Sequence, residues 1–356
     1  MRTKLLIAST SDPDMWYVLG VPVSDPVALI DTGRTRYVLA SALELPRLRR
    51  LRGITAVPLR TVLGPDGSLA GAALRFLAQR GIRSVRMSPT SPVRIVEHIR
   101  RRLHVHIGEL YPERRCKTRR ERRLISAVRD ATVAALSTCL RLIKQSTVKR
   151  GALFVDGQAL TAERLRLEAR RVLLAYACSA PELIISHGLQ TASPHEHGAG
   201  VLRAGEPIML DFFPRSMETG YWFDMTRTVC KGPAPPSLRK LWRTVLAAQA
   251  AALATVQAGV PVRRVHEAAE QVFLEAGYET SASEGFIHGT GHGVGLEIHE
   301  APRIGQVKGR LAAGDVITIE PGLYYRRVGG VRIEDTIVVT KQGYTDLTNY
   351  PKVLHI

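Results

Sequence analysis

Short apolar runs alternate with helical patterns along the first part of the chain. Apolar runs at residues 4–8, 27–31, 37–40, 54–59 and 84–87 predict strands. Apolar positions at helical spacing over residues 67–80 and 92–103 predict two helices. This alternation is typical of a small α/β domain, which we place at residues 1–112.

A long amphipathic helix is predicted to begin at about Thr118, near the start of a second domain at residues 113–356. Thr118 and Glu121 have the spacing of a capping box. Further helices are predicted at residues 161–176, 237–258 and 262–276, and the last two are expected to close at Gly259 and Gly277. Hairpin-like stretches between and after these helices carry acidic residues.

The composition is that of an ordinary globular protein, with 356 residues of which 45% are hydrophobic. The apolar run at the N-terminus turns polar at Ser9, too early for a signal peptide, and no apolar run reaches the length of about 18 residues that spans a membrane. The four cysteines are widely spaced and form no CxxC pair, which favours free thiols in a reducing compartment. These features predict a cytoplasmic protein.

A group of acidic residues and one histidine stand in short contexts suited to a divalent metal. They are Asp211, Asp224, His292, Glu320 and Glu334. A single acidic residue is usually a surface carboxylate, but Glu320 follows the apolar run 316–319 and Glu334 ends a similar stretch. A buried carboxylate has to be paired, protonated or bound to metal. Carboxylates and an imidazole without a thiolate suit hard or borderline cations such as Mn²⁺, Co²⁺, Fe²⁺ or Zn²⁺.

The order and wording of these motifs over roughly residues 180–340 resemble the pita-bread metallopeptidase family, which includes aminopeptidase P, prolidase and methionine aminopeptidase. The resemblance implies an α/β (α+β) fold: a pita-bread catalytic domain with pseudo-two-fold halves, after a smaller creatinase-like N-terminal domain. It also implies two divalent ions, with manganese as first choice over cobalt, zinc or iron. Asp211, Asp224 and Glu334 would hold one ion, and Asp224, His292, Glu320 and Glu334 the other.

Two such cations a few ångströms apart lower the pKa of a bridging water and polarise a substrate carbonyl. By resemblance, Glu320 is also the general base for this water. His299 would stabilise the tetrahedral intermediate, His195 would contact the substrate near the scissile amide, and His288 would line the site. The alternative is that these histidines are ordinary polar residues, and it weighs more for His288 than for His195 and His299.

The spacing between Asp211 and Asp224 departs from the family pattern. They are 224 − 211 = 13 positions apart, two more than usual, and Phe212-Phe213-Pro214 replaces the common small residues. An insertion of two keeps the strand parity, so both acids can still face one side of a hairpin with a longer turn through residues 215–220. The alternative is a displaced Asp211 and a weakened metal site.

Positive charge supports a competing interpretation. The net charge is +18, and residues 114–123 contain a dense basic run. This run is typical of either a phosphate-binding face or a solvated helix start. No aromatic residues of the kind that stack on bases accompany it, and the glycines around His292 lack a Walker lysine. The alternative function is therefore a non-catalytic basic protein with the pita-bread fold that binds nucleic acid or acidic partners. This alternative is less favoured than an enzyme.

The preferred hypothesis is a dinuclear-metal exopeptidase that hydrolyses Xaa-Pro bonds at the N-terminus of short peptides. The extra N-terminal domain disfavours methionine aminopeptidase, and the full set of ligands disfavours creatinase-like chemistry. Arg303 resembles the arginine by which short prolidases grip the free carboxylate of a dipeptide, but an ordinary surface arginine fits the sequence equally well. Aminopeptidase P and prolidase specificity therefore both stay open. The family resemblance further suggests a homodimer.

Overall fold

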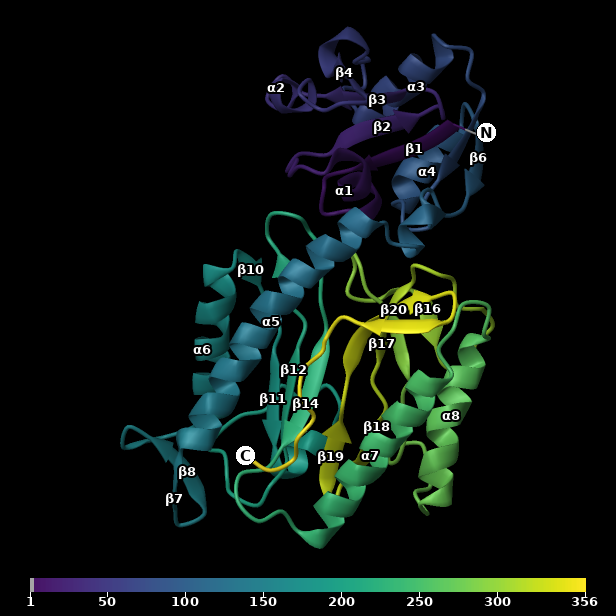
Figure 1. The fold of residues 1–356 in the computed structure, drawn as a ribbon. Coiled ribbons are helices and arrows are strands. Elements are labelled where there is room, and N and C mark those ends of the chain that lie inside the picture. The colour runs from purple at the N-terminus through teal and green to yellow at the C-terminus, as the bar shows by residue number, and fades with distance from the viewer. Residues whose placement is uncertain (1–2) are drawn as a thin grey trace. The chain divides into compact units, whose positions relative to one another are not determined.

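A computed structural model describes residues 3–356 of the chain. The chain divides into two compact units, Met1–Arg114 and Arg115–Ile356. Each unit is described by itself (Figure 1).

The first unit is built on a six-stranded mixed sheet with strand order β4-β3-β2-β1-β5-β6. Its strands are β1 (Thr3–Ala8), β2 (Val27–Asp31), β3 (Arg36–Ala40), β4 (Ile54–Pro58), β5 (Ser84–Met87) and β6 (His104–Ile107). The five predicted strands are confirmed to within a residue or so at their ends. Strand β6 was not predicted, because its alternating histidines and apolar residues lie at the partly exposed sheet edge and give a weak hydrophobic signal.

Helices cover both faces of this sheet, which explains its apolar strands. They are α1 (Pro13–Leu19), α2 (Leu45–Leu48), α3 (Leu69–Ala78) and α4 (Val93–Arg100), with 3₁₀ turns η1 (Leu59–Thr61) and η2 (Pro112–Arg115). Successive residues of β2 alternate between two cores. Ile30 packs in the core that contains Phe76 of α3, and Leu29 packs in the core that contains Met15 of α1. The predicted helices α3 and α4 are confirmed, whereas the seven-residue α1 was too short to give a helical period.

The second unit has two halves, each with a pair of packed helices and an antiparallel sheet (Figure 1). The helices are α5 (Arg119–Gln145), α6 (Ala162–Ala175), α7 (Pro236–Ala254) and α8 (Val262–Glu275). The capping box at Thr118 and Glu121 is present. The predicted end of α7 was wrong, since the helix stops at Ala254. Beyond it, the Ala258 N–H donates to the Thr340 carbonyl and the Gly259 N–H donates to the Leu311 carbonyl, so neither continues the helix.

Most of the candidate site residues lie on strands of this unit or directly beside a strand end. The first half contains a sheet in the order β11 (Ile184–His187), β12 (Ile208–Phe212) and β14 (Met225–Val229). The second half contains a sheet in the order β16 (Glu300–Ile304), β15 (Gly291–Gly293), β17 (Val316–Ile319), β20 (Asp335–Thr340) and β21 (Gly343–Asp346). Smaller pairings complete the unit: β18 (Gly322–Tyr325) with β19 (Gly329–Arg332), β10 (Cys178–Ser179) with β13 (Arg215–Ser216), and β7 (Thr147–Lys149), β8 (Ala152–Val155) and β9 (Gln158–Ala159); η3 spans Gly188–Ala192.

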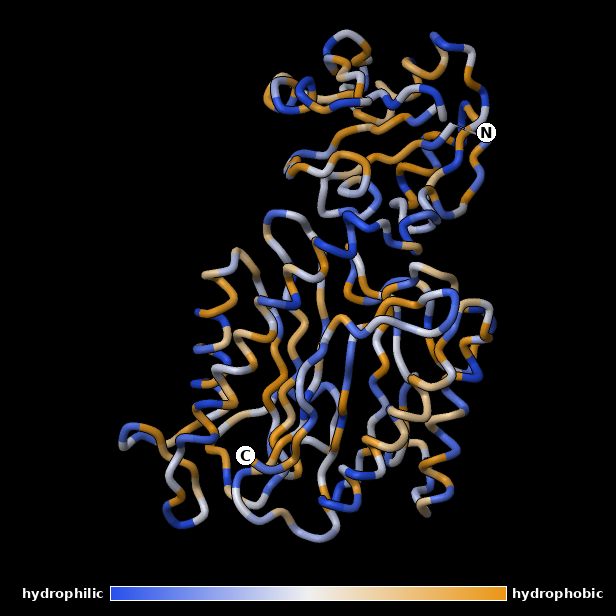
Figure 2. The backbone as a smooth tube through the Cα atoms, in the orientation of Figure 1, coloured by the Kyte–Doolittle hydropathy of each residue, from blue (hydrophilic) through white to orange (hydrophobic). Residues whose placement is uncertain are grey.

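Amphipathic helices close this unit over its sheets. Hydrophobic and hydrophilic positions alternate along the helices in Figure 2. Buried residues of α7 and α8, such as Val245 and Phe273, pack with Ile317 and Ile337 of the second sheet. The strand ends that bear the acids are thereby fixed from behind. Among the described residues, no helix is long and apolar enough to cross a membrane.

The contribution of the N-terminal core can be measured with one buried and one exposed leucine. Leu29 is 1% exposed and Leu43 is 83% exposed. We expect Leu29→Ala to lower the free energy of unfolding of the first unit by about 2–5 kcal/mol, because it removes buried methyl groups and leaves a cavity. Leu43→Ala should change it by less than about 0.5 kcal/mol. Urea denaturation followed by circular dichroism, fitted with one transition per unit, gives both values. Equal losses would contradict the packing described here.

Candidate metal centre

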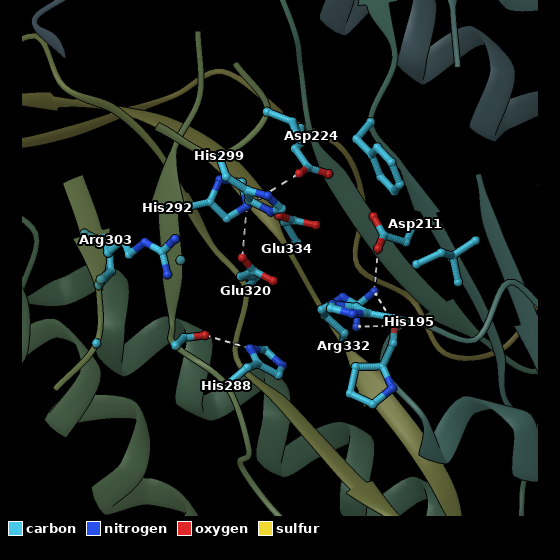
Figure 3. Close-up of a pocket in the computed structure, with 18 of the residues that line it drawn as sticks. His195, Asp211, Asp224, His288, His292, His299, Arg303, Glu320, Arg332 and Glu334 are labelled. Atoms are coloured by element: carbon cyan, nitrogen blue, oxygen red, sulfur yellow. Dashed lines mark hydrogen bonds and ion pairs between the residues drawn. The ribbon is translucent and has the colours of Figure 1, made fainter. Parts of the chain in front are cut away.

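A pocket of about 800 Å³ opens in the second unit, and every site residue expected from the sequence lines it. These residues are His195, Asp211, Asp224, His288, His292, His299, Arg303, Glu320 and Glu334. Most of them lie on strands or beside strand ends in both halves of the unit, and Figure 3 shows Asp224, His292, Glu320 and Glu334 close to one another. Apolar side chains, among them Phe213 and Ile298, form part of the same wall.

Asp211 and Asp224 reach the pocket from one antiparallel pair of strands. Asp211 lies on β12 opposite Thr226 of β14, and Asp224 directly precedes β14. This register puts both acids on the same face of the sheet, as the preserved parity predicts. The two extra residues are taken up by the segment after Phe212, which forms β13 and a turn at residues 217–219.

The second sheet supplies the remaining groups. His292 lies on β15, Glu320 directly follows β17, and Glu334 stands between β19 and β20. His292 Nε2 lies 3.2 Å from Glu320 Oε1 and 3.6 Å from Asp224 Oδ2. One ligand atom each from Asp224, His292 and Glu334 lies within 4.8 Å of the other two. This is close enough for all three to hold a single ion.

Three buried carboxylate oxygens support metal binding most directly. Asp211 Oδ1, Asp224 Oδ1 and Glu334 Oε1 accept no hydrogen bond from any of residues 3–356. The second oxygen of two of these acids is held, because Arg332 donates to Asp211 Oδ2 and Thr226 donates to Glu334 Oε2 over 2.6 Å. Buried polar atoms are rarely left without a partner. Oxygens that converge on one space fit a hard or borderline divalent cation.

Burial and mutual repulsion set the protonation of these acids. Burial, together with the charges of the surrounding carboxylates, raises the pKa of Asp224 and of Glu334 well above the ordinary values. Glu320 behaves in the opposite way. Burial opposes its ionisation, but the hydrogen bond and charge of His292, with His288 and Arg332 nearby, lower the pKa of Glu320 to about 2. Without a cation, Asp224 and Glu334 therefore keep their protons to higher pH than free carboxylic acids do, whereas Glu320 ionises at lower pH.

The sequence interpretation missed Arg332, which is 3% exposed and reaches into the same pocket. Its guanidinium donates to Asp211, to the Tyr324 hydroxyl over 2.7 Å and to Thr226 Oγ1 over 3.3 Å. Arg332 stands two residues before Glu334, so strand parity would place both on one face. The two-residue spacing between Arg332 and Glu334 is the sequence feature that could have identified Arg332 as a pocket residue. It was obscured because arginines are common throughout this chain.

The supporting histidines occupy different environments. The Tyr324 hydroxyl lies 2.8 Å from His288 Nε2, and His288 Nδ1 lies 2.7 Å from the Gly289 carbonyl. A neutral His288 that donates from Nδ1 and accepts at Nε2 satisfies both contacts, and burial lowers the pKa of His288 accordingly. The ring of His299 lies 4.2 Å from that of His292, edge to face. Partial burial and His292 lower the pKa of His299.

Glycines around His292 are required by close backbone packing. A Cβ at Gly291 would lie 2.0 Å from the Thr318 carbonyl, and one at Gly293 would lie 2.4 Å from that of Ala301. None of the glycines at positions 289, 291, 293 and 295 has a positive φ. At Gly291 and Gly293 it is the absence of a side chain that the neighbouring strands require.

Several known proteins with similar sequences are named as peptidases. The Xaa-Pro dipeptidase of Pyrococcus horikoshii is 37% identical over 175 residues, which are 49% of this chain and 48% of that protein. An uncharacterised peptidase of Bacillus subtilis is 34% identical over 180 residues, 50% of this chain and 49% of that protein. The matched region thus spans about half the length of these curated relatives.

Solved structures resemble the chain over its full length. The Xaa-Pro dipeptidase from Bacillus anthracis has a TM-score of 0.83 with 23% identity and covers 100% of this chain and 95% of its own. The X-Pro aminopeptidase from Thermotoga maritima has a TM-score of 0.82 with 22% identity and covers 100% and 98%. These likenesses confirm the predicted fold class. The sequence model described as metallopeptidase family M24 matches residues 123–341, more than half of the chain, and the chain therefore belongs to that family.

Proposed function

We propose that the protein is a dinuclear-metal exopeptidase that hydrolyses the Xaa-Pro bond at the N-terminus of short peptides. The observation that carries this proposal is the convergence of buried, unpartnered carboxylate oxygens beside His292 in one pocket. Membership of a metallopeptidase family and relatives named Xaa-Pro dipeptidase support the substrate class.

The proposed ligand sets follow from the donors that face the pocket. Asp211, Asp224 and Glu334 would hold one divalent ion, and Asp224, His292, Glu320 and Glu334 the other. Their oxygen and nitrogen donors suit manganese, our first choice, and also cobalt, zinc or iron. When bound, such ions lower the pKa of an attacking water and polarise the scissile carbonyl.

The residues around the ligands would complete the chemistry. The low pKa of Glu320 keeps its carboxylate ionised, so it can take the proton from the attacking water. A neutral His299 would donate an N–H to the oxygen that gains charge at the peptide carbon. His195 lines the wall opposite Arg303 in the view of Figure 3, where it would contact the substrate near the scissile amide. His288 would hold the Tyr324 hydroxyl in place.

Arg303 would decide between the two Xaa-Pro specificities. It lies on β16 and lines the pocket with Gln306 and Val307. A guanidinium there offers an ion pair to the free carboxylate of a dipeptide. Arg303 would contribute less to binding a longer peptide, because the free carboxylate of that peptide lies farther from the scissile bond.

The alternative of a non-catalytic basic binding protein is not favoured. Two cations of the basic run at residues 114–123 are turned into the second unit, where Arg115 pairs with Asp315 and Lys117 pairs with Glu300. The run therefore presents less free charge than its sequence suggests. The expected homodimer stays a prediction.

Metal-dependent turnover tests the proposal. Metal-stripped protein refilled with Mn²⁺, Co²⁺ or Zn²⁺ should cleave Xaa-Pro dipeptides or Xaa-Pro-Yaa tripeptides. Glu320→Gln should lower kcat by roughly 10²–10⁴-fold, because it removes the proton acceptor. Circular dichroism should remain that of the parent protein. A folded wild type that binds metal but cleaves neither substrate would falsify the proposed activity.

Arg303→Met tests the choice of substrate. We expect kcat/KM for a dipeptide to fall by about 10- to 100-fold, the loss typical of one hydrogen bond to a charged group, with tripeptides affected less. Arg327 is exposed, and Arg327→Met is a matched control that should leave kcat/KM unchanged for both substrates. An equal loss for dipeptides and tripeptides would show that Arg303 does not bind the free carboxylate.

Metal binding should release protons. Because burial and the neighbouring carboxylates raise the pKa of Asp224 and of Glu334, these acids keep their protons to higher pH than free carboxylic acids do and lose them when a cation binds. Apparent metal affinity should therefore still rise with pH above the range in which free carboxylic acids titrate, by about tenfold per pH unit for each proton released. Isothermal titration calorimetry in two buffers of different ionisation enthalpy counts these protons. Equal heats in both buffers would contradict the prediction.

A further inference from the structure

Just before α5, a lysine of the basic run at residues 114–123 is buried inside the second unit. Lys117 and Glu300 form an ion pair in which their side chains are 1% and 8% exposed. Lys117 Nζ also donates to the Arg115 carbonyl over 3.1 Å. A lysine is rarely this buried unless its charge has a partner, so Glu300 determines where Lys117 lies.

Glu300 holds the turn that joins His292 to His299. Its carboxylate lies so close to the backbone of that turn that a Cβ at Gly295 would be 2.6 Å from either carboxylate oxygen. His299 directly precedes Glu300, and its ring contacts His292. The Lys117–Glu300 ion pair therefore connects the end of this turn to the N-terminus of α5, because Lys117 directly precedes the N-cap residue Thr118.

The same end of α5 reaches the segment that carries Asp224. Glu121 closes the capping box with Thr118 and also accepts a hydrogen bond from the Tyr221 hydroxyl over 2.8 Å. Next to Tyr221, the Trp222 N–H donates to the Gly295 carbonyl over 2.8 Å, and Trp222 Nε1 donates to the Leu296 carbonyl over 3.2 Å. The segment that carries Asp224 and the 293–300 turn thus contact each other, and both contact the N-terminal end of α5.

We propose that Lys117 is a positioning residue, whose buried ion pair with Glu300 fixes the 293–300 turn and thereby the placement of His299 in the pocket. Its role in turnover rests on the proposed peptidase function, but the placement itself does not. Lys117 touches neither the proposed metal ligands nor the substrate space, because it is absent from the pocket lining. It acts only through Glu300.

Removal of the lysine leaves a buried carboxylate without its cation, and such a group moves toward water or takes up a proton. Either response disturbs the turn beside His299. Arginine keeps the charge at this position, so Lys117→Arg should restore much of the arrangement. Loss of another buried ion pair elsewhere in the same segment should lower stability without moving His299. Arg115→Met provides that comparison, because Arg115 pairs with the fully buried Asp315.

The test follows the His299 ring itself by nuclear magnetic resonance of ¹³C-labelled imidazoles in metal-free protein. His299→Gln identifies its signal. Lys117→Met should shift or broaden that signal, Lys117→Arg should keep it near its original place, and Arg115→Met and the exposed Lys308→Met should leave it unmoved. Glu300→Gln, which keeps Lys117, should also move the signal and serves if Lys117→Met does not fold. An unmoved His299 signal in folded Lys117→Met, or an equal shift in Arg115→Met, overturns the proposal.

Turnover provides a second, separate measurement. In metal-loaded protein, Lys117→Met should lower kcat at least tenfold with a smaller change in KM, because the donor to the reacting oxygen is displaced. Metal content should stay that of the parent protein. If the wild type cleaves no Xaa-Pro peptide, the proposed function fails while the imidazole signals still decide the placement of His299.

Discussion

Four carboxylates share one buried pocket, and their mutual repulsion constrains the structure around them. Asp211, Asp224 and Glu334 are buried and Glu320 is partly buried, and charges a few ångströms apart at low dielectric repel strongly. Asp224 and Glu334 meet this cost by holding protons, while Glu320 stays ionised beside His292. Divalent cations remove the repulsion at its source. The same arrangement that destabilises the metal-free pocket is thus what gives the site its affinity for metal.

An arginine holds Asp211 from behind, and the Thr226 hydroxyl holds Glu334. Arg332 binds Asp211, and its strand also leads to Glu334. Directly after Glu334, the fully buried Asp335 pairs with Arg227 over 2.8 Å and with Lys352 near the C-terminus. Arg227 additionally donates to the Glu334 carbonyl over 2.6 Å. These contacts orient the ligands without occupying the oxygens that face the pocket, which is how surrounding groups tune a metal site.

The start of α5 shows how the two halves of the second unit become one site. Ligand-bearing segments from both sheets have to keep fixed distances although they are far apart in sequence. Lys117 and Glu121 reach one segment each, and Trp222 connects those segments directly. In the sequence, the basic run at residues 114–123 is typical of a phosphate-binding face. In the structure, Arg115 and Lys117 of this run form ion pairs with Asp315 and Glu300. A basic run is therefore a poor guide to surface charge when acidic residues elsewhere in the chain can pair with it.

Local sequence determined the elements and the chemistry. Apolar runs predicted five strands of the first unit, and helical spacing predicted most of the longer helices. The capping box predicted the start of α5, and acids after apolar runs marked the proposed metal donors. These signals are local because they depend on neighbours within a few residues. The partners of Arg332 and Lys117, the early end of α7 and the reason for the glycines around His292 depended on residues distant in the chain. Only the tertiary structure decided them, because burial and pairing are properties of groups that the fold brings together.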